Sequence, residues 1–171
     1  MTTLVLTVVG EDRPGLVADL SAVLHAAGAS WERSEMARLA GQFAGIVEVS
    51  VPADRVESLE PGWERLRAAG LQVVVTGTAA PSPPAGRQLR LELVGNDRPG
   101  IVAEISGLLA RLAVSIEELS TEVRDAPMAG GTLFEARAVL AVPAGLAEDE
   151  LRAALEALAD ELVVELSLAE H

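Results

Sequence analysis

The chain has 171 residues, half of them hydrophobic, which is enough for one ordinary domain or two small ones with buried cores. Its formal net charge is −13, and all 13 basic residues are arginines scattered through an acidic background. Because nucleic-acid binding depends on a concentrated basic face that neutralises phosphates, this composition argues against direct contact with DNA or RNA.

The first part of the chain predicts six elements in the order βαββαβ. Short apolar, β-branched segments indicate strands, and apolar residues at spacings of three and four indicate helices. The apolar face of the first helix comprises Leu16, Val17, Leu20, Val23, Leu24 and Ala27. The predicted elements are a strand at 3–9, a helix that ends at Gly28, strands at 30–39 and 42–51, a helix over 56–66 and a strand at 71–76.

Two turn signals refine this first part. Ala40-Gly41 lies between the second and third strands and predicts that they form a hairpin. Pro61-Gly62 interrupts the second helix, because proline cannot continue the hydrogen-bond pattern of a helix interior. We therefore expect that helix to break there or to restart at Pro61.

The second part of the chain predicts the same order of elements. Its first helix presents an apolar face that comprises Ile101, Val102, Ile105, Leu108, Leu109 and Leu112. The predicted elements are a strand at 89–94, a helix at 99–112, strands at 114–123 and 132–142, a helix over 151–162 and a strand at 162–168.

The two parts also share a repeated sequence. Residues 10–24, GEDRPGLVADLSAVL, and 95–109, GNDRPGIVAEISGLL, are identical at nine of fifteen positions, which indicates two domains of one type. The segment AAPSPPAGR between them has the composition of a linker. We therefore predict a first domain at 1–78, a linker at 79–87 and a second domain at 88–171.

The βαββαβ order predicts an α+β protein made of two tandem ferredoxin-like domains. Each domain is expected to have one antiparallel sheet with both helices on one face. The opposite face of each sheet then needs cover, which the other domain or a second chain could supply. We expect a homodimer, because exposed sheets tend to pair.

The repeated GxDRPG turn joins a strand to a helix. Asp12 is placed to accept hydrogen bonds from the first helical amides, Pro14 suits the first helical turn, and Gly15 allows another group to approach closely. Asp97, Pro99 and Gly100 repeat this arrangement. The turn is either a structural cap or a small-ligand site, because amides at a helix start attract anions such as carboxylates. Repetition alone does not decide between the two.

These residues resemble the ACT domain, a small ligand-binding regulatory module with the same βαββαβ order. Over 3–168 the chain resembles more specifically the glycine cleavage system transcriptional repressor family, which consists of two tandem ACT domains. The stretches that carry this resemblance are GEDRPGLVADLSAVLHAAGASW, GNDRPGIVAEISGLLARLAVSIEELSTEV and APMAGGTLFEARAVLAVP.

The resemblance implies an amino-acid site at an interface between two domains, built on the loop before the first helix. The second contact in such sites is often an Asn at the start of strand two, whereas this chain has Ser30 and Ser115 there. Glu11 would repel an acidic ligand and Asn96 would not, so the second domain is the predicted binder. The predicted ligand-binding residues are Asn96, Asp97, Pro99, Gly100 and Ser115 in the second domain, with Asp12, Pro14, Gly15 and Ser30 in the first.

The resemblance also implies a function in transcriptional regulation. Repressors of this family act on a partner transcription factor by protein contact, and glycine or a related signal would change that contact. The alternative is a structural or assembly protein that keeps the fold but has lost ligand binding.

The remaining sequence patterns favour a non-catalytic protein. We find no nucleotide-binding, nucleophile-elbow or calcium-loop motif, so we predict no enzyme activity, no cofactor and no metal. The chain has no Cys, no apolar run that approaches the roughly 18 residues of a membrane span and no signal-peptide start. We therefore expect a cytoplasmic protein without membrane contact.

Overall fold

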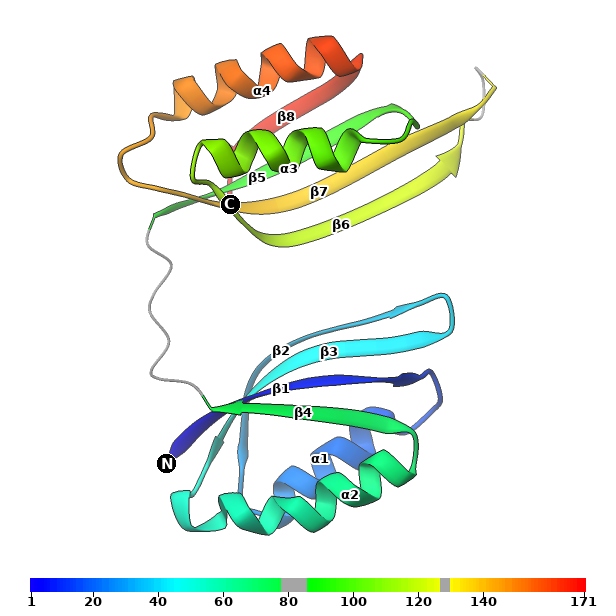
Figure 1. Cartoon of the computed structure of the whole chain (residues 1–171), viewed down its shortest axis with the longest axis vertical. Coiled ribbons are helices and arrows are strands. Elements are labelled where there is room, and N and C mark those ends of the chain that lie inside the picture. The colour runs from blue at the N-terminus through cyan, green and yellow to red at the C-terminus, as the bar shows by residue number, and fades with distance from the viewer. Residues whose placement is uncertain (78–85, 127–129) are drawn as a thin grey trace. The chain divides into compact units, whose positions relative to one another are not determined.

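The computed structural model describes residues 1–77, 86–126 and 130–171. The chain divides into two compact units, Met1–Pro81 and Ser82–His171. Each unit has a four-stranded antiparallel sheet with both helices on one face, as Figure 1 shows. This confirms the predicted α+β class and the tandem ferredoxin-like architecture.

The first unit follows the predicted element order, and its sheet has the strand order β2-β3-β1-β4. A 3-10 helix, Ala53–Leu59, precedes α2 directly, and Pro61 lies in the first turn of α2, so the predicted helix break is confirmed. The elements are β1 (Thr2–Glu11), α1 (Leu16–Ala26), β2 (Ser30–Leu39), β3 (Gln42–Val51), α2 (Glu60–Ala68) and β4 (Leu71–Gly77).

The second unit has the same topology, with the strand order β6-β7-β5-β8. Its elements are β5 (Arg87–Asn96), α3 (Ile101–Arg111), β6 (Ser115–Asp125), β7 (Thr132–Val142), α4 (Glu148–Leu162) and β8 (Val164–Glu170). Arg87, which we assigned to the linker, pairs with Val142 as the first residue of β5. The rest of the predicted linker, apart from Gly86, lies outside the described residues, so the domain boundaries stay a prediction.

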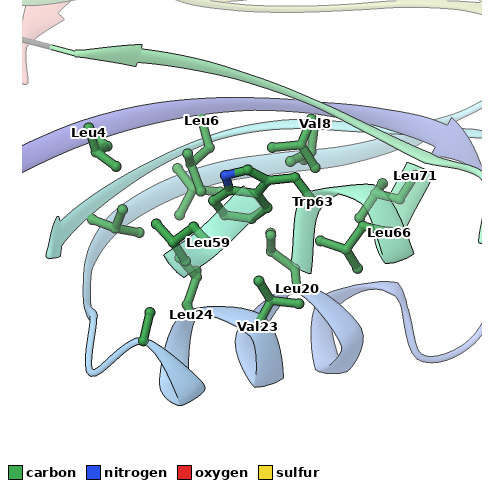
Figure 2. Close-up of a cluster of buried hydrophobic side chains, with 14 of the residues drawn as sticks. Leu4, Leu6, Val8, Leu20, Val23, Leu24, Leu59, Trp63, Leu66 and Leu71 are labelled. Carbon is green, nitrogen blue, oxygen red and sulfur yellow. The ribbon is translucent and has the colours of Figure 1, made fainter. Parts of the chain in front are cut away.

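Each unit builds its own core between its sheet and its two helices. Along β1, Leu4, Leu6 and Val8 are buried and alternate with more exposed residues, as expected for a strand with one covered face. Figure 2 shows Trp63 of α2 between these strand residues and Leu20 of α1. A separate cluster fills the second unit, with Leu93, Leu140, Leu151 and Leu155 among its fully buried members.

The hairpin between β2 and β3 forms as predicted. Ala40 and Gly41 have φ angles of 50° and 78°, the pair of positive values that a tight two-residue β-hairpin turn requires. Because β2 pairs with β3 from Ser30↔Ser50 to Leu39↔Gln42, the hairpin tip lies at the end of β1 where the GEDRPG turn begins.

Val17 and Val102 lie at the margins of the apolar faces that we predicted. They are 45% and 43% exposed, whereas Leu16 and Ile101, the residues just before them, are buried. The faces of α1 and α3 that contact the sheets are too narrow for both residues of each pair, since neighbours on a helix point about 100° apart.

Two kinds of feature are absent from the described residues. No helix in these ranges combines the length and apolar character needed to cross a membrane. In the same ranges, no group of three or more His, Cys, Asp or Glu side chains is arranged to hold a metal ion.

Candidate ligand-binding turns

Both GxDRPG turns are fastened to the adjacent hairpin by a backbone hydrogen bond. The N–H of Asp12 donates to the carbonyl oxygen of Gly41 at 2.9 Å, and the N–H of Asp97 donates to that of Thr132 at 2.9 Å. These bonds fix the backbone between the end of the strand and the start of the helix. The repeated sequence therefore produces the same turn in each unit.

The aspartates of the two turns do not cap the helices, contrary to our prediction. The residue before each helix is a glycine in the left-handed conformation, Gly15 with φ of 94° and Gly100 with φ of 98°, and neither helix start has a side-chain cap. The carbonyl oxygens of these glycines accept the first helical hydrogen bonds, from Asp19 and Glu104. The left-handed residue turns the chain, so the aspartate side chain lies outside the helix start.

The proline of each turn does not lie where we predicted, whereas the space beside the glycine is open as we expected. Pro14 and Pro99 lie in the turn two residues before the helix, and not in its first turn. A side chain at Gly15 would have open space, since the nearest atom to an added Cβ is the Arg13 Nη1 at 3.8 Å. Glycine is thus required by the positive φ and not by a close neighbour.

An arginine that our sequence analysis did not single out spans each helix start. Arg13 donates to the Asp19 carboxylate at 2.8 Å, and Arg98 donates to the Glu104 carboxylate at 3.1 Å. Each arginine also donates to the carbonyl oxygen of the proline that follows it, at 3.3 Å. Both arginines lie inside the repeated DRPG motif, so the repetition of this motif could have identified them in the sequence.

The two aspartates differ in their ion pairing. Asp12 accepts a hydrogen bond from Arg38 of β2 at 3.3 Å. Val123 pairs with Phe134 in the second unit, as Arg38 pairs with Phe43 in the first. Val123 therefore occupies the position that is equivalent to Arg38. Within the described ranges, the Asp97 carboxylate has neither an ion pair nor a hydrogen bond. The second unit thus presents an uncompensated carboxylate at its turn.

The serines that we placed in the site lie far from the turn of their own unit. Ser30 pairs with Ser50, which pairs with Thr3 at the beginning of β1, whereas the turn follows Glu11 at its end. Eight residues of extended strand span about 26 Å. Ser115 is separated from Asn96 in the same way, through Ala141 and Gln88. The structure therefore does not bring each serine to the aspartate of its own unit.

Comparison with known proteins agrees with the fold. Residues 2–76 match the family model described as the ACT domain. A solved structure of an unknown protein from Galdieria sulphuraria is 35% identical to this chain and superposes with a TM-score of 0.87. The match covers 99% of this chain and 98% of the Galdieria chain. The first unit therefore belongs to the ACT domain family, and the second unit repeats its fold.

A more particular resemblance is to the glycine cleavage system transcriptional repressor. The protein of that name from Escherichia coli (strain K12) is 25% identical over 162 residues, which cover 93% of this chain and 85% of the repressor. A solved structure of a proposed repressor of the same name shares the fold, with a TM-score of 0.70 at 20% identity over 98% of this chain and 95% of its own.

Proposed function

We propose that this protein is a non-catalytic regulator that senses a small ligand, an amino acid such as glycine, and controls a partner transcription factor by protein contact. The observation that carries the proposal is the GNDRPG turn, where the Asp97 carboxylate is uncompensated within the described residues. The resemblance to a transcriptional repressor along most of the chain supports the regulatory role.

The chemistry of the turn suits a zwitterionic ligand. The Asp97 carboxylate would attract the ammonium group of an amino acid, which is a charge-assisted contact. The ligand carboxylate would be held by the Asn96 amide and by the first backbone N–H groups of α3, which have no partner within the helix. Glu11 replaces Asn96 in the first unit and Arg38 already engages Asp12 there, so that unit would be the weaker site.

Ser115 can contact the same ligand only if another domain supplies it. We propose that a second copy of the chain provides this contact, so that the protein acts as a homodimer. A cytoplasmic location is also part of the proposal, because the chain resembles a transcriptional repressor.

A specific observation favours a second candidate function, a structural or assembly protein without a ligand. Arg98 pairs with Glu104 in the first turn of α3, so a carboxylate of the chain already lies near the positive end of the helix. The turn would then be a purely structural joint.

Calorimetric titration of the full-length chain with glycine, serine and alanine separates the two functions. Saturable one-site binding of at least one amino acid, together with a higher melting temperature, is the expected result. A well-folded protein that binds no amino acid in a wider screen, and shows no thermal shift with any, would contradict amino-acid sensing and support the assembly function.

A further inference from the structure

The ion pair between Arg98 and Glu104 lies directly beside the start of α3. The Nη1 atom of Arg98 donates to the Glu104 carboxylate at 3.1 Å and to the carbonyl oxygen of Pro99 at 3.3 Å. A Cβ added at Gly100 would lie 3.5 Å from the Glu104 Oε1 and 4.0 Å from the same Nη1. Both charged groups therefore lie over the residue that precedes the helix.

The first backbone N–H groups of α3 have no acceptor in the helix itself. The first helical hydrogen bond runs from the N–H of Glu104 to the carbonyl oxygen of Gly100 at 2.9 Å. The N–H groups of Ile101, Val102 and Ala103 precede this bond, so the helix offers them no carbonyl. No side chain of the described residues caps this helix start. These N–H groups are thus available to an anion.

The charge of Glu104 would oppose a ligand carboxylate at this place. Two like charges about 4 Å apart repel each other appreciably even near a solvated surface. Arg98 supplies the opposite charge at hydrogen-bond distance, so that the pair as a whole is neutral. The two side chains are 40% and 44% exposed, and an ion pair this exposed contributes little to stability. Its main physical effect is on the electrostatic potential at the helix start.

The equivalent arginine of the first unit has an additional contact that joins two helices. Arg13 donates through Nη2 to the Asp19 carboxylate at 2.8 Å and to the carbonyl oxygen of Ala69 at 3.5 Å. It thereby connects the start of α1 with the end of α2. Arg98 has no hydrogen bond to the end of α4 within the described ranges. The joining of two helices therefore does not explain the position of Arg98.

We propose that Arg98 is a positioning residue for the carboxylate of the ligand. Arg98 acts through Glu104, because its guanidinium group holds this side chain and cancels its charge. The first N–H groups of α3 can then bind the ligand carboxylate, while Asp97 binds the ammonium group. The site would select ligands that have a free carboxylate beside an ammonium group. The inference rests on the proposed function, since it concerns the same amino-acid site.

A double-mutant cycle on the full-length chain tests this inference. Glycine, or the amino acid that binds most tightly in the screen, is titrated calorimetrically into each variant. We expect Arg98→Gln to weaken binding at least fivefold, because Glu104 then keeps an uncompensated charge beside the ligand carboxylate. Glu104→Gln should bind at least as tightly as the wild-type protein. The double variant Arg98→Gln/Glu104→Gln should return to within about twofold of the wild-type affinity, because the opposing carboxylate is gone.

The double variant separates this role from a merely structural one. If Arg98 only fixed the turn through its hydrogen bond to Pro99, binding would stay weak in the double variant, because that bond is lost there as well. Arg98→Lys keeps the charge, so its affinity should fall less than that of Arg98→Gln. Arg13→Gln removes the same charge and the equivalent pair in the first unit, and should change the affinity less than twofold. Circular dichroism checks that every variant is folded.

Glycinamide tests the selection for a carboxylate, because it keeps the ammonium group of glycine and lacks the carboxylate. It should bind the wild-type protein at least tenfold more weakly than glycine does.

Four results would overturn the inference: unchanged binding by Arg98→Gln, a double variant as weak as Arg98→Gln, an equal loss in Arg13→Gln, or glycinamide that binds as tightly as glycine. In each of these results the wild-type protein still binds an amino acid, so the proposed function stands. A wild-type protein that binds no amino acid would contradict the proposed function and this inference together.

Discussion

The two units have the same topology and the same turn, yet their chemistry differs at equivalent positions. In the first unit Arg38 pairs with Asp12, and Trp31 packs against the core. In the second unit Val123 and Ile116 take these places, the Asp97 carboxylate is uncompensated within the described residues, and an apolar pocket lies beside β6. A repeated motif thus maintains the backbone, while residues outside the motif determine what each unit can bind.

The largest expected effect is the loss of stability when a core residue of one unit is truncated. Trp63 is 3% exposed in the first core, so we expect Trp63→Ala to destabilise that unit by about 3–5 kcal/mol. Leu155→Ala is the matched change in the second core, with a loss of about 2–5 kcal/mol. Denaturant unfolding measures the stability of both variants. Tryptophan fluorescence reports the first unit alone, because Trp31 and Trp63 are the only tryptophans, whereas far-ultraviolet circular dichroism reports both units.

In the Leu155→Ala variant, the midpoint of tryptophan fluorescence should stay unchanged while part of the dichroism signal unfolds earlier. If every core variant shifts both signals together, the units unfold as one cooperative body and the comparison between separate cores fails.

A smaller change in stability is expected when one equivalent core position, Val47 or Ala138, receives the residue of the other unit. Val47→Ala should create a cavity in the first unit and reduce its stability by about 2 kcal/mol, because Val47 is fully buried. The reverse change, Ala138→Val, should raise the stability of the second unit by up to about 1 kcal/mol, because Ala138 lines an apolar pocket that the larger side chain would partly fill. Thermal unfolding of both variants measures this, and a destabilised Ala138→Val protein would mean that the pocket is closed in solution.

The smallest effect concerns the ion pair that only the first unit has. Asp12→Asn should reduce stability by about 0.2–1 kcal/mol, because the pair with Arg38 is largely exposed. Salt should reduce this difference further, since screening weakens exposed ion pairs. Asp97→Asn should leave stability unchanged, and a loss as large as that of Asp12→Asn would reveal a partner of Asp97 in the folded protein. Thermal melts at 50 mM and 500 mM NaCl compare the two variants.

The sequence predicted the elements well because local patterns determine them. The alternation in residues 42–51, the Ala40-Gly41 turn and the helix restart near Pro61 all depend on neighbours within a few positions. The capping role of Asp12 and Asp97 was wrong, because a left-handed glycine follows each proline and the helix begins two residues after the proline.

The differences between the units could not be predicted from local patterns. The pair between Arg38 and Asp12 joins residues 26 positions apart, and it depends on the register of β2 against β3. The distance between each serine and the turn of its own unit likewise follows only from the sheet register. Such contacts arise from tertiary pairing, so the repeated motif gave no sign of them.

We propose that the second unit binds an amino acid through Asp97. Calorimetric titration of glycine, or of the amino acid that binds most tightly in the screen, into wild-type, Asp12→Ala and Asp97→Ala proteins tests it most directly. We expect Asp97→Ala to weaken binding at least tenfold, Asp12→Ala to change it less than threefold, and both variants to remain folded. Equal losses in the two variants, or a larger loss in Asp12→Ala, would contradict it.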